Sequence, residues 1–143
     1  MDRRVSVTRT IEVPAPAGHV LGAVQNIKNI EHCEVKADAV TVFPDSDAHG
    51  WYAVRGHFAG VPWRGRFTYA LNAKGFHSHN ETRTVEGGFR VEPLRDDHCV
   101  VAHYEEYVLA RWLVPLRGAI RQYLRWSMSR ELEDLAALAT STS

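Results

Sequence analysis

The sequence has little cysteine and no long hydrophobic run. Only Cys33 and Cys99 occur among its 143 residues, and no apolar stretch is long enough to span a bilayer. Two cysteines cannot form a disulfide scaffold in a chain of this size, so a reducing compartment is favoured and we expect a cytoplasmic protein. The N-terminal segment is charged and lacks the apolar core of a signal peptide, which supports the same expectation.

Neither sign of charge predominates. The chain has 17 Lys and Arg residues and 17 Asp and Glu residues, so its formal net charge is zero. The positive field typical of nucleic-acid-binding proteins is missing, and we expect no nucleic-acid partner. Lysine itself is scarce, because arginine outnumbers the three lysines Lys28, Lys36 and Lys74.

Several catalytic motifs are missing as well. The pair Gly87-Gly88 precedes an expected strand rather than a helix, so it lacks the setting of a phosphate-binding loop. No Gly-x-Ser-x-Gly segment occurs, which argues against an acyl-serine hydrolase. Among eight histidines only His77 and His79 share a face of one expected strand, and no set has the spacing of a zinc site. We therefore expect neither a metal nor a cofactor.

The chain does contain segments in which apolar and polar residues alternate with a period of two, which is typical of half-buried strands. Clusters rich in Gly, Pro, Asn and Asp separate these segments and predict tight turns. We expect an α+β fold in which residues 1–143 form one domain with an antiparallel meander and two short helices after the first strand. The expected strands are residues 5–13, 35–43, 51–58, 62–71, 76–85, 89–94 and 98–109.

The last part of the sequence predicts one long amphipathic helix over residues 112–139. Its apolar side is not uniform, because Ser127 and Glu131 lie in the middle of the stripe that should face the sheet. A helix that only fills a core more often carries leucine or alanine there, so this helix is interpreted as one wall of a pocket. The stripe consists of Leu113, Leu116, Ile120, Tyr123, Leu124, Leu135 and Leu138.

The order of these elements, with the segment Ile11-Glu12-Val13-Pro14-Ala15-Pro16-Ala17-Gly18-His19-Val20 at the start, resembles the helix-grip (SRPBCC) superfamily. That superfamily includes START lipid-transfer domains, the Bet v 1 allergen and bacterial polyketide cyclase/dehydrase proteins. The resemblance implies a curved seven-stranded antiparallel sheet wrapped around the long C-terminal helix, with a hydrophobic cavity between them. It also implies a lipid- or polyketide-like ligand.

Polyketide aromatase/cyclases are the enzymes that the chain resembles most. In them a strand that begins with Trp supplies pocket groups, and Trp63 matches that residue. Phe67 and Tyr69 stand where these cyclases tend to have a polar residue and an arginine. The resemblance further implies that Arg83, on the next expected strand, corresponds to a second pocket arginine.

Strand alternation predicts which side chains face the cavity, although a shift of one residue would turn each strand over. This alternation makes Arg55, His103 and Glu105 the candidates for polar contacts with a ligand or for catalysis. Glu105 or His103 would act as a base, and Arg55 would neutralise Glu105 or stabilise an enolate-like oxygen. The predicted inward residues are Trp51, Ala53, Arg55 and His57; Trp63, Gly65, Phe67 and Tyr69; and Val101, His103, Glu105, Tyr107 and Leu109.

These residues favour binding of a hydrophobic or aromatic small molecule between sheet and helix. The alternatives are a polyketide cyclase or dehydratase, a plain packed core, and an interaction module that uses the arginine flank Arg117, Arg121 and Arg125. The expected state is a monomer or homodimer with no membrane span. The predicted ligand-binding residues are Trp51, Arg55, Trp63, Phe67, Tyr69, Arg83, His103, Glu105, Tyr107, Tyr123 and Ser127.

Overall fold

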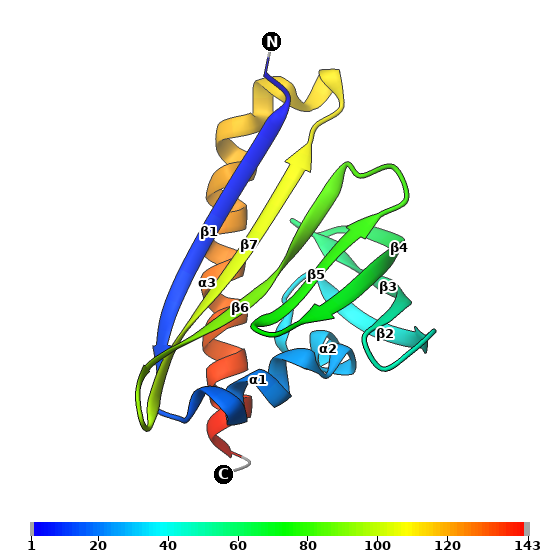
Figure 1. Ribbon diagram of the computed structural model, residues 1–143. Helices are drawn as coiled ribbons and strands as arrows, with labels where there is room; N and C mark the ends of the chain where they lie inside the picture. The colour runs from blue at the N-terminus through cyan, green and yellow to red at the C-terminus, as the bar shows by residue number, and fades with distance from the viewer. Residues whose placement is uncertain (1, 142–143) are drawn as a thin grey trace.

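A computed structural model describes residues 2–141 of the chain, so residues 1, 142 and 143 of the expected domain lie outside it. Seven strands form one antiparallel sheet in the order β1-β7-β6-β5-β4-β3-β2 (Figure 1). The strands β2 to β7 form a meander, and β1 is the edge strand that pairs with β7. The strands are β1 (Arg4–Val13), β2 (Ala37–Pro44), β3 (His49–Phe58), β4 (Val61–Asn72), β5 (Gly75–Asn80), β6 (Val85–Arg95) and β7 (His98–Val108).

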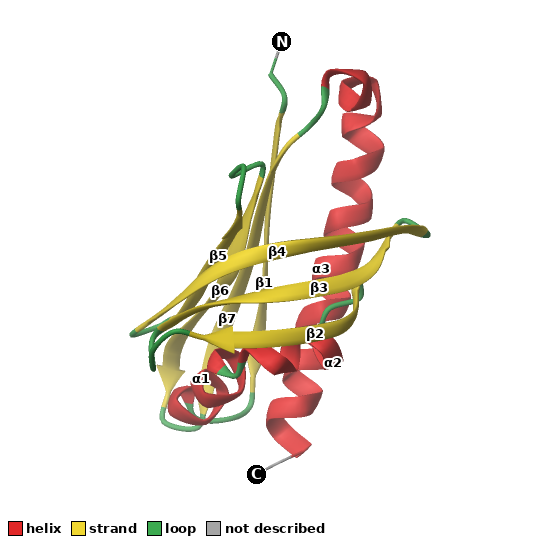
Figure 2. Ribbon diagram, turned by 90° about the vertical axis from the view of Figure 1, so that its right-hand side faces the viewer, coloured by secondary structure: helices red, strands yellow, loops and turns green. Residues whose placement is uncertain are grey.

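One face of the sheet curves around the long C-terminal helix. This helix, α3 (Arg117–Ser141), runs along β1 and β7 (Figure 1), whereas β2, β3 and β4 cross in front of it in the view of Figure 2. Two short helices lie at the end of the molecule where α3 finishes. The architecture confirms the predicted helix-grip fold. The remaining helices are α1 (Ala17–Gln25), α2 (Ile30–Cys33) and the 3₁₀ segments Ile27–Asn29 and Arg111–Leu116.

The sheet-facing side of α3 forms a large part of the hydrophobic core. Leu124, Met128, Leu132 and Leu135 recur at helical spacing and are at most 3% exposed. Leu132 and Leu135 belong to a hydrophobic cluster that includes Val20 and Val24 of α1, and Leu124 and Met128 belong to a second cluster with Val5 and Val7 of β1. Ser127 and Glu131 are fully buried on the same side, as their positions on the helix predicted. None of the helices in the described part of the chain is both long and apolar enough to cross a bilayer.

The strand predicted over residues 76–85 is wrong in its second half. β5 ends at Asn80, whose side-chain oxygen accepts hydrogen bonds from the backbone N–H groups of Thr84 and Val85 and so closes a turn. Arg83 lies in this turn with φ of 53°, exposed to solvent, so it is not a pocket arginine on a strand. Gly88, expected in the following turn, lies inside β6, where a Cβ atom would come 2.0 Å from the carbonyl oxygen of Phe76.

The predicted orientation of β3 is also wrong, by one residue. Tyr52 and Val54 are buried on the inner face, whereas Arg55 is exposed on the outer face. Trp51 lies outside too, stacked on Phe43 at 4.0 Å between ring centroids. The reason is that both faces of this segment carry apolar and aromatic residues, so alternation alone does not distinguish them. His57, predicted inward, is likewise exposed and pairs with Asp38.

Candidate functional site

A cavity of about 600 Å³ lies between the inner face of the sheet and the start of the C-terminal helical region. Its volume is in the range of small-molecule sites. Val61, Trp112 and Leu116 line its outer part and are 64%, 76% and 52% exposed, so apolar side chains surround an opening to solvent. The wall below them is largely aromatic and is formed by Tyr52, Phe58, Trp63, Phe67, Phe76 and Phe89.

The aromatic wall is held in shape by contacts between rings on neighbouring strands. Tyr52 on β3 stacks on Phe67 on β4 at 5.4 Å between centroids, and Trp63 meets Phe67 edge to face at 6.3 Å. The hydroxyl of Tyr52 donates a hydrogen bond to Ser78 Oγ at 3.0 Å. These contacts give a rigid apolar surface with few free polar groups, which suits an apolar or aromatic ligand.

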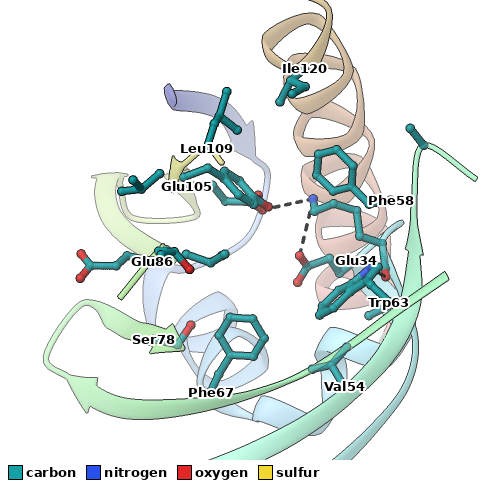
Figure 3. Close-up of a pocket in the computed structure, with 18 of the residues that line it drawn as sticks. Glu34, Val54, Phe58, Trp63, Phe67, Ser78, Glu86, Glu105, Leu109 and Ile120 are labelled. Carbon is teal, nitrogen blue, oxygen red and sulfur yellow. Dashed lines mark hydrogen bonds and ion pairs between the residues drawn. The ribbon is translucent and has the colours of Figure 1, made fainter. Parts of the chain in front are cut away.

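The polar end of the cavity is organised by Lys36, whose side chain is 2% exposed. Its ammonium nitrogen lies 2.7 Å from a carboxylate oxygen of Glu131, 3.2 Å from Glu105 and 3.6 Å from Glu34. In Figure 3, dashed lines join this ammonium to the carboxylates of Glu105 and Glu34. A buried lysine is stable only with such partners, so its charge is matched by carboxylates from three separate elements.

The backbone of Lys36 is fixed against β3 and β4 by two hydrogen bonds. Its carbonyl oxygen accepts from the backbone N–H of His57 at 3.1 Å and from Nε1 of Trp63 at 3.2 Å. Gly56 makes this approach possible, because a Cβ atom at that position would lie 1.7 Å from the same oxygen. A glycine on β3 therefore determines where the ammonium enters the cavity.

His103 on β7 is held as an imidazolium. Its Nδ1 lies 2.9 Å from the carbonyl oxygen of Gly88, and its Nε2 lies 3.0 Å from both Glu105 and Glu131. All three partners only accept hydrogen bonds when the carboxylates are ionised, so both ring nitrogens must donate. Burial lowers the pKa of His103, but the hydrogen bonds and charges of the two carboxylates outweigh it and raise the pKa to about 10.

Glu105 is the best-partnered carboxylate of the cluster. Besides Lys36 and His103 it accepts a hydrogen bond from the Tyr107 hydroxyl at 2.6 Å. Burial raises the pKa of Glu105, but Lys36 and the hydrogen bonds from His103 and Tyr107 hold it well below its usual range. Burial and the Glu105 charge in turn raise the pKa of Tyr107. Gly87 faces Glu105 across β6 and β7, and a Cβ atom there would come 3.2 Å from the Glu105 side chain.

Glu34 differs from the other two carboxylates. Its side chain is 21% exposed, compared with 6% for Glu105 and 0% for Glu131. Within residues 2–141 its carboxylate has the Lys36 ion pair at 3.6 Å and no hydrogen bond. Burial and the charge of Glu131 raise the pKa of Glu34 to about 7, against the opposing charge of Lys36. Glu34 is thus the group in this cavity best suited to exchange a proton near neutral pH.

Three of these residues also have the geometry of metal ligands. His103, Glu105 and Glu131 offer ligand atoms that all lie within 4.8 Å of one another. The Lys36 ammonium already lies between the two carboxylates, and His103 donates to both of them. The positive charge that neutralises Glu105 and Glu131 is therefore supplied by the side chains themselves.

The structure brings together only part of the set predicted to bind a ligand. Trp63, Phe67, His103, Glu105 and Tyr107 line the cavity. Three others pack around it: Tyr69 is buried beside Tyr52, Tyr123 lies 4.8 Å from the Phe58 ring, and Ser127 lies 3.4 Å from the Lys36 nitrogen. The predictions for Trp51, Arg55 and Arg83 are wrong, since these residues lie outside the cavity.

Sequence reasoning missed Lys36 and Glu34, the two groups that complete the polar end. The expected strand 35–43 would place Lys36 on the same face as Asp38, which is exposed, so the pattern indicates a solvent-facing lysine. In the structure β2 begins only at Ala37, with an irregular register between Ala37 and Ala39, and Lys36 belongs to the turn before it. The sequence feature that could have pointed to Lys36 is the scarcity of lysine in this arginine-rich chain.

No protein-family model and no curated protein matches the sequence. Solved structures do match the fold. TTHA0849 from Thermus thermophilus is 14% identical with a TM-score of 0.85, covering 97% of this chain and 99% of that one. The Zhui aromatase/cyclase from Streptomyces sp. R1128 is 15% identical with a TM-score of 0.73, covering 96% and 94%. A START superfamily protein from Mycobacterium smegmatis is 14% identical with a TM-score of 0.74, covering 96% and 99%.

The matches confirm the helix-grip fold. The matched structures include a START superfamily protein and an aromatase/cyclase, the two kinds of protein that the sequence resembles. A shared fold carries many functions, so the activity has to be argued from the cavity of this chain.

Proposed function

We propose that the protein binds a hydrophobic or aromatic small molecule in the cavity between the sheet and the C-terminal helix. The observation that carries the proposal is an open cavity of about 600 Å³ whose wall is aromatic and whose polar groups converge at one end. A core that only supports the fold would close such a space, because unfilled volume costs packing energy. The ligand would place its apolar part against Phe67 and Trp63 and its polar part toward Glu34.

Filling the cavity should weaken ligand binding without unfolding the protein. We expect Val54→Phe, on the inner face of β3, to weaken binding of the neutral probe 2-naphthylmethanol by about tenfold or more, since the new ring occupies ligand space. The matched control is Ala53→Phe, which adds the same ring to the outer face of the same strand. Equal binding by both variants, with unchanged circular dichroism, would reject the cavity as the binding site.

An enzymatic role is the second candidate, and Glu34 is the observation that favours it. Its pKa of about 7 and its position in the cavity suit a group that takes a proton from a bound molecule and returns it. His103 and Glu105 suit this role less well, because the first is held protonated and the second ionised. The likeness in fold to aromatase/cyclases supports testing polyketide cyclisation or dehydration first.

If the protein is such an enzyme, Glu34→Gln should reduce turnover of a poly-β-ketone substrate by about a hundredfold or more, since the amide cannot carry the proton. The wild-type rate should rise with an inflection near pH 7 as Glu34 ionises. Glu86→Gln serves as the control, because the Glu86 carboxylate points away from the cavity (Figure 3) and pairs with His77 and Arg83. Turnover that is equal in the two variants would exclude Glu34 as the catalytic base.

A further inference from the structure

We infer that the ligand of this cavity carries one protonated nitrogen, and that its ammonium group binds beside Glu34. The inference rests on the proposed ligand-binding function and names the chemical class of the ligand: an apolar or aromatic amine. It follows from the balance of charge at the polar end of the cavity, the incomplete pairing of Glu34, and the surface that surrounds it.

The first step is the balance of charge. The polar end combines three carboxylates, Glu34, Glu105 and Glu131, with two cations, Lys36 and His103. Glu105 and Glu131 each contact both cations, so these four groups neutralise one another. With Glu34 ionised, the polar end therefore holds one negative charge in excess, which a ligand cation would neutralise.

The second step is access. Glu105 and Glu131 are almost fully enclosed, and their oxygens already accept from Lys36, His103, Tyr107 or the backbone N–H of Val35. The carboxylate of Glu34 has no hydrogen bond within residues 2–141, and it lines the cavity. An acceptor left incomplete in an apolar cavity is costly, so a donor supplied by the ligand would bind strongly there.

The third step is the surface that an ammonium would meet. Trp63 is tied through its indole nitrogen to the backbone of Lys36, the residue whose side chain pairs with Glu34, and Figure 3 shows Trp63 lining the same part of the cavity. Aromatic faces attract cations, and the attraction is greatest where water is excluded. A ligand carboxylate would instead be repelled by the ionised Glu34, and a ligand without a cation would leave Glu34 with the Lys36 ion pair as its one charged partner within residues 2–141.

Binding of an amine should depend on pH, because the ammonium pairs with ionised Glu34. Glu34, with a pKa of about 7, loses its proton when the amine binds, so affinity falls as the pH drops below 7. The other charged or titratable groups around it are Lys36, Glu105, Glu131, His103, Tyr52, Tyr107 and Cys33. The pKa of Glu105 lies well below its usual range and the pKa values of Lys36, His103, Tyr52, Tyr107 and Cys33 are raised, so these six groups keep their charge state between pH 6 and pH 8. Glu86 borders the cavity, but its carboxylate points away from it (Figure 3) and pairs with Arg83 and His77, so it is not part of the proposed binding site.

The test compares three probes of nearly equal shape: 2-naphthylmethylamine, 2-naphthylmethanol and 2-naphthoate. Dissociation constants are measured by calorimetry at pH 8 and pH 6 for the wild type, Glu34→Gln and the control Glu86→Gln. We expect the wild type at pH 8 to bind the amine about tenfold or more tightly than the alcohol, and the alcohol more tightly than the naphthoate. Amine affinity should fall about tenfold from pH 8 to pH 6, while alcohol affinity stays level.

Glu34→Gln should remove the preference for the amine and its pH dependence, while alcohol binding persists and Glu86→Gln behaves as the wild type. Wild-type binding of the alcohol or the naphthoate that equals or exceeds binding of the amine overturns the inference and leaves the ligand-binding function standing. A preference for the amine that survives in Glu34→Gln also overturns it. Failure of all three probes to bind the folded wild type overturns the ligand-binding proposal together with the inference.

Discussion

Replacing Lys36 with methionine is expected to lower the free energy of unfolding by about 3–5 kcal/mol at pH 7, because it removes one of the two cations that neutralise the buried carboxylates. Methionine keeps most of the volume of the side chain, so the loss reports charge and hydrogen bonding rather than a cavity. Glu105 and Glu131 lie 3.2 Å and 2.7 Å from the ammonium nitrogen, and both are at most 6% exposed. Urea unfolding followed by circular dichroism measures the difference.

The control is Lys74→Met, which removes the same group from the exposed pair between Lys74 and Glu92. Exposed pairs contribute about 0–1 kcal/mol, so this variant should remain near the wild type. A loss of similar size in both variants would contradict the role assigned to Lys36.

The effect of Lys36→Met should also depend on pH. Burial raises the pKa of Glu105, but Lys36 and the hydrogen bonds from His103 and Tyr107 lower it further, so the folded value lies below the unfolded one. A carboxylate of this kind adds stability above its unfolded pKa, about 4.3, and that contribution is lost as the pH falls below it. The gap between wild type and variant should therefore be widest near neutral pH and narrow at pH 3–4. A gap of constant width would mean that lost packing, not charge, is responsible.

The fold was predictable from the sequence because its signals are redundant. Alternating segments, turn clusters and the amphipathic stretch each indicate the same seven strands and final helix, and an error at one boundary leaves the others intact. The error at Gly87-Gly88 shows this, since two glycines that resemble a turn serve instead for close packing inside β6. The order of the strands in the sheet was unaffected.

The site was less predictable because it depends on single positions. Arg55 was predicted to face inward because a shift of one residue along a strand reverses the face of every side chain. Lys36 was missed for a related reason, since the register of β2 is irregular between Ala37 and Ala39. Arg55 on β3 was predicted to neutralise Glu105, whereas in the structure Lys36, in the turn before β2, pairs with Glu105. His103, Glu105, Ser127 and Glu131 were predictable because they interrupt otherwise apolar faces.

The cluster links the stability of the fold to the properties of the cavity. Lys36 joins the turn before β2 to α3 through Glu131 and to β7 through Glu105. Rigid pairing of these groups keeps them from binding a ligand, and it leaves Glu34 as the one incompletely satisfied acid at the polar end within residues 2–141. The same ion pairs that hold the helix to the sheet thus define which group a ligand meets.

His103 is the second residue expected to have a large effect on the free energy of unfolding, through its dependence on pH. Its pKa rises from 6.5 to about 10 because the hydrogen bonds and charges of Glu105 and Glu131 outweigh the cost of burial. A group whose pKa is raised by folding adds stability that is complete below the unfolded pKa and is lost as the pH rises toward the folded value. We therefore expect the free energy of unfolding of the wild type to fall by about 1 kcal/mol or slightly more from pH 7 to pH 8.

His103→Gln should lower stability at pH 7 by about 2 kcal/mol or more, since both carboxylates lose a charged donor. It should also remove most of the decline between pH 7 and pH 8, leaving the smaller slope due to Glu34, whose pKa is raised to about 7, and the buried thiol of Cys33, whose pKa is raised to about 11. The control His57→Gln changes an exposed histidine paired with Asp38 and should keep the wild-type slope. A wild type whose stability does not change over this interval would show that His103 is not an imidazolium, and Lys36 would then be the only cation of the cluster.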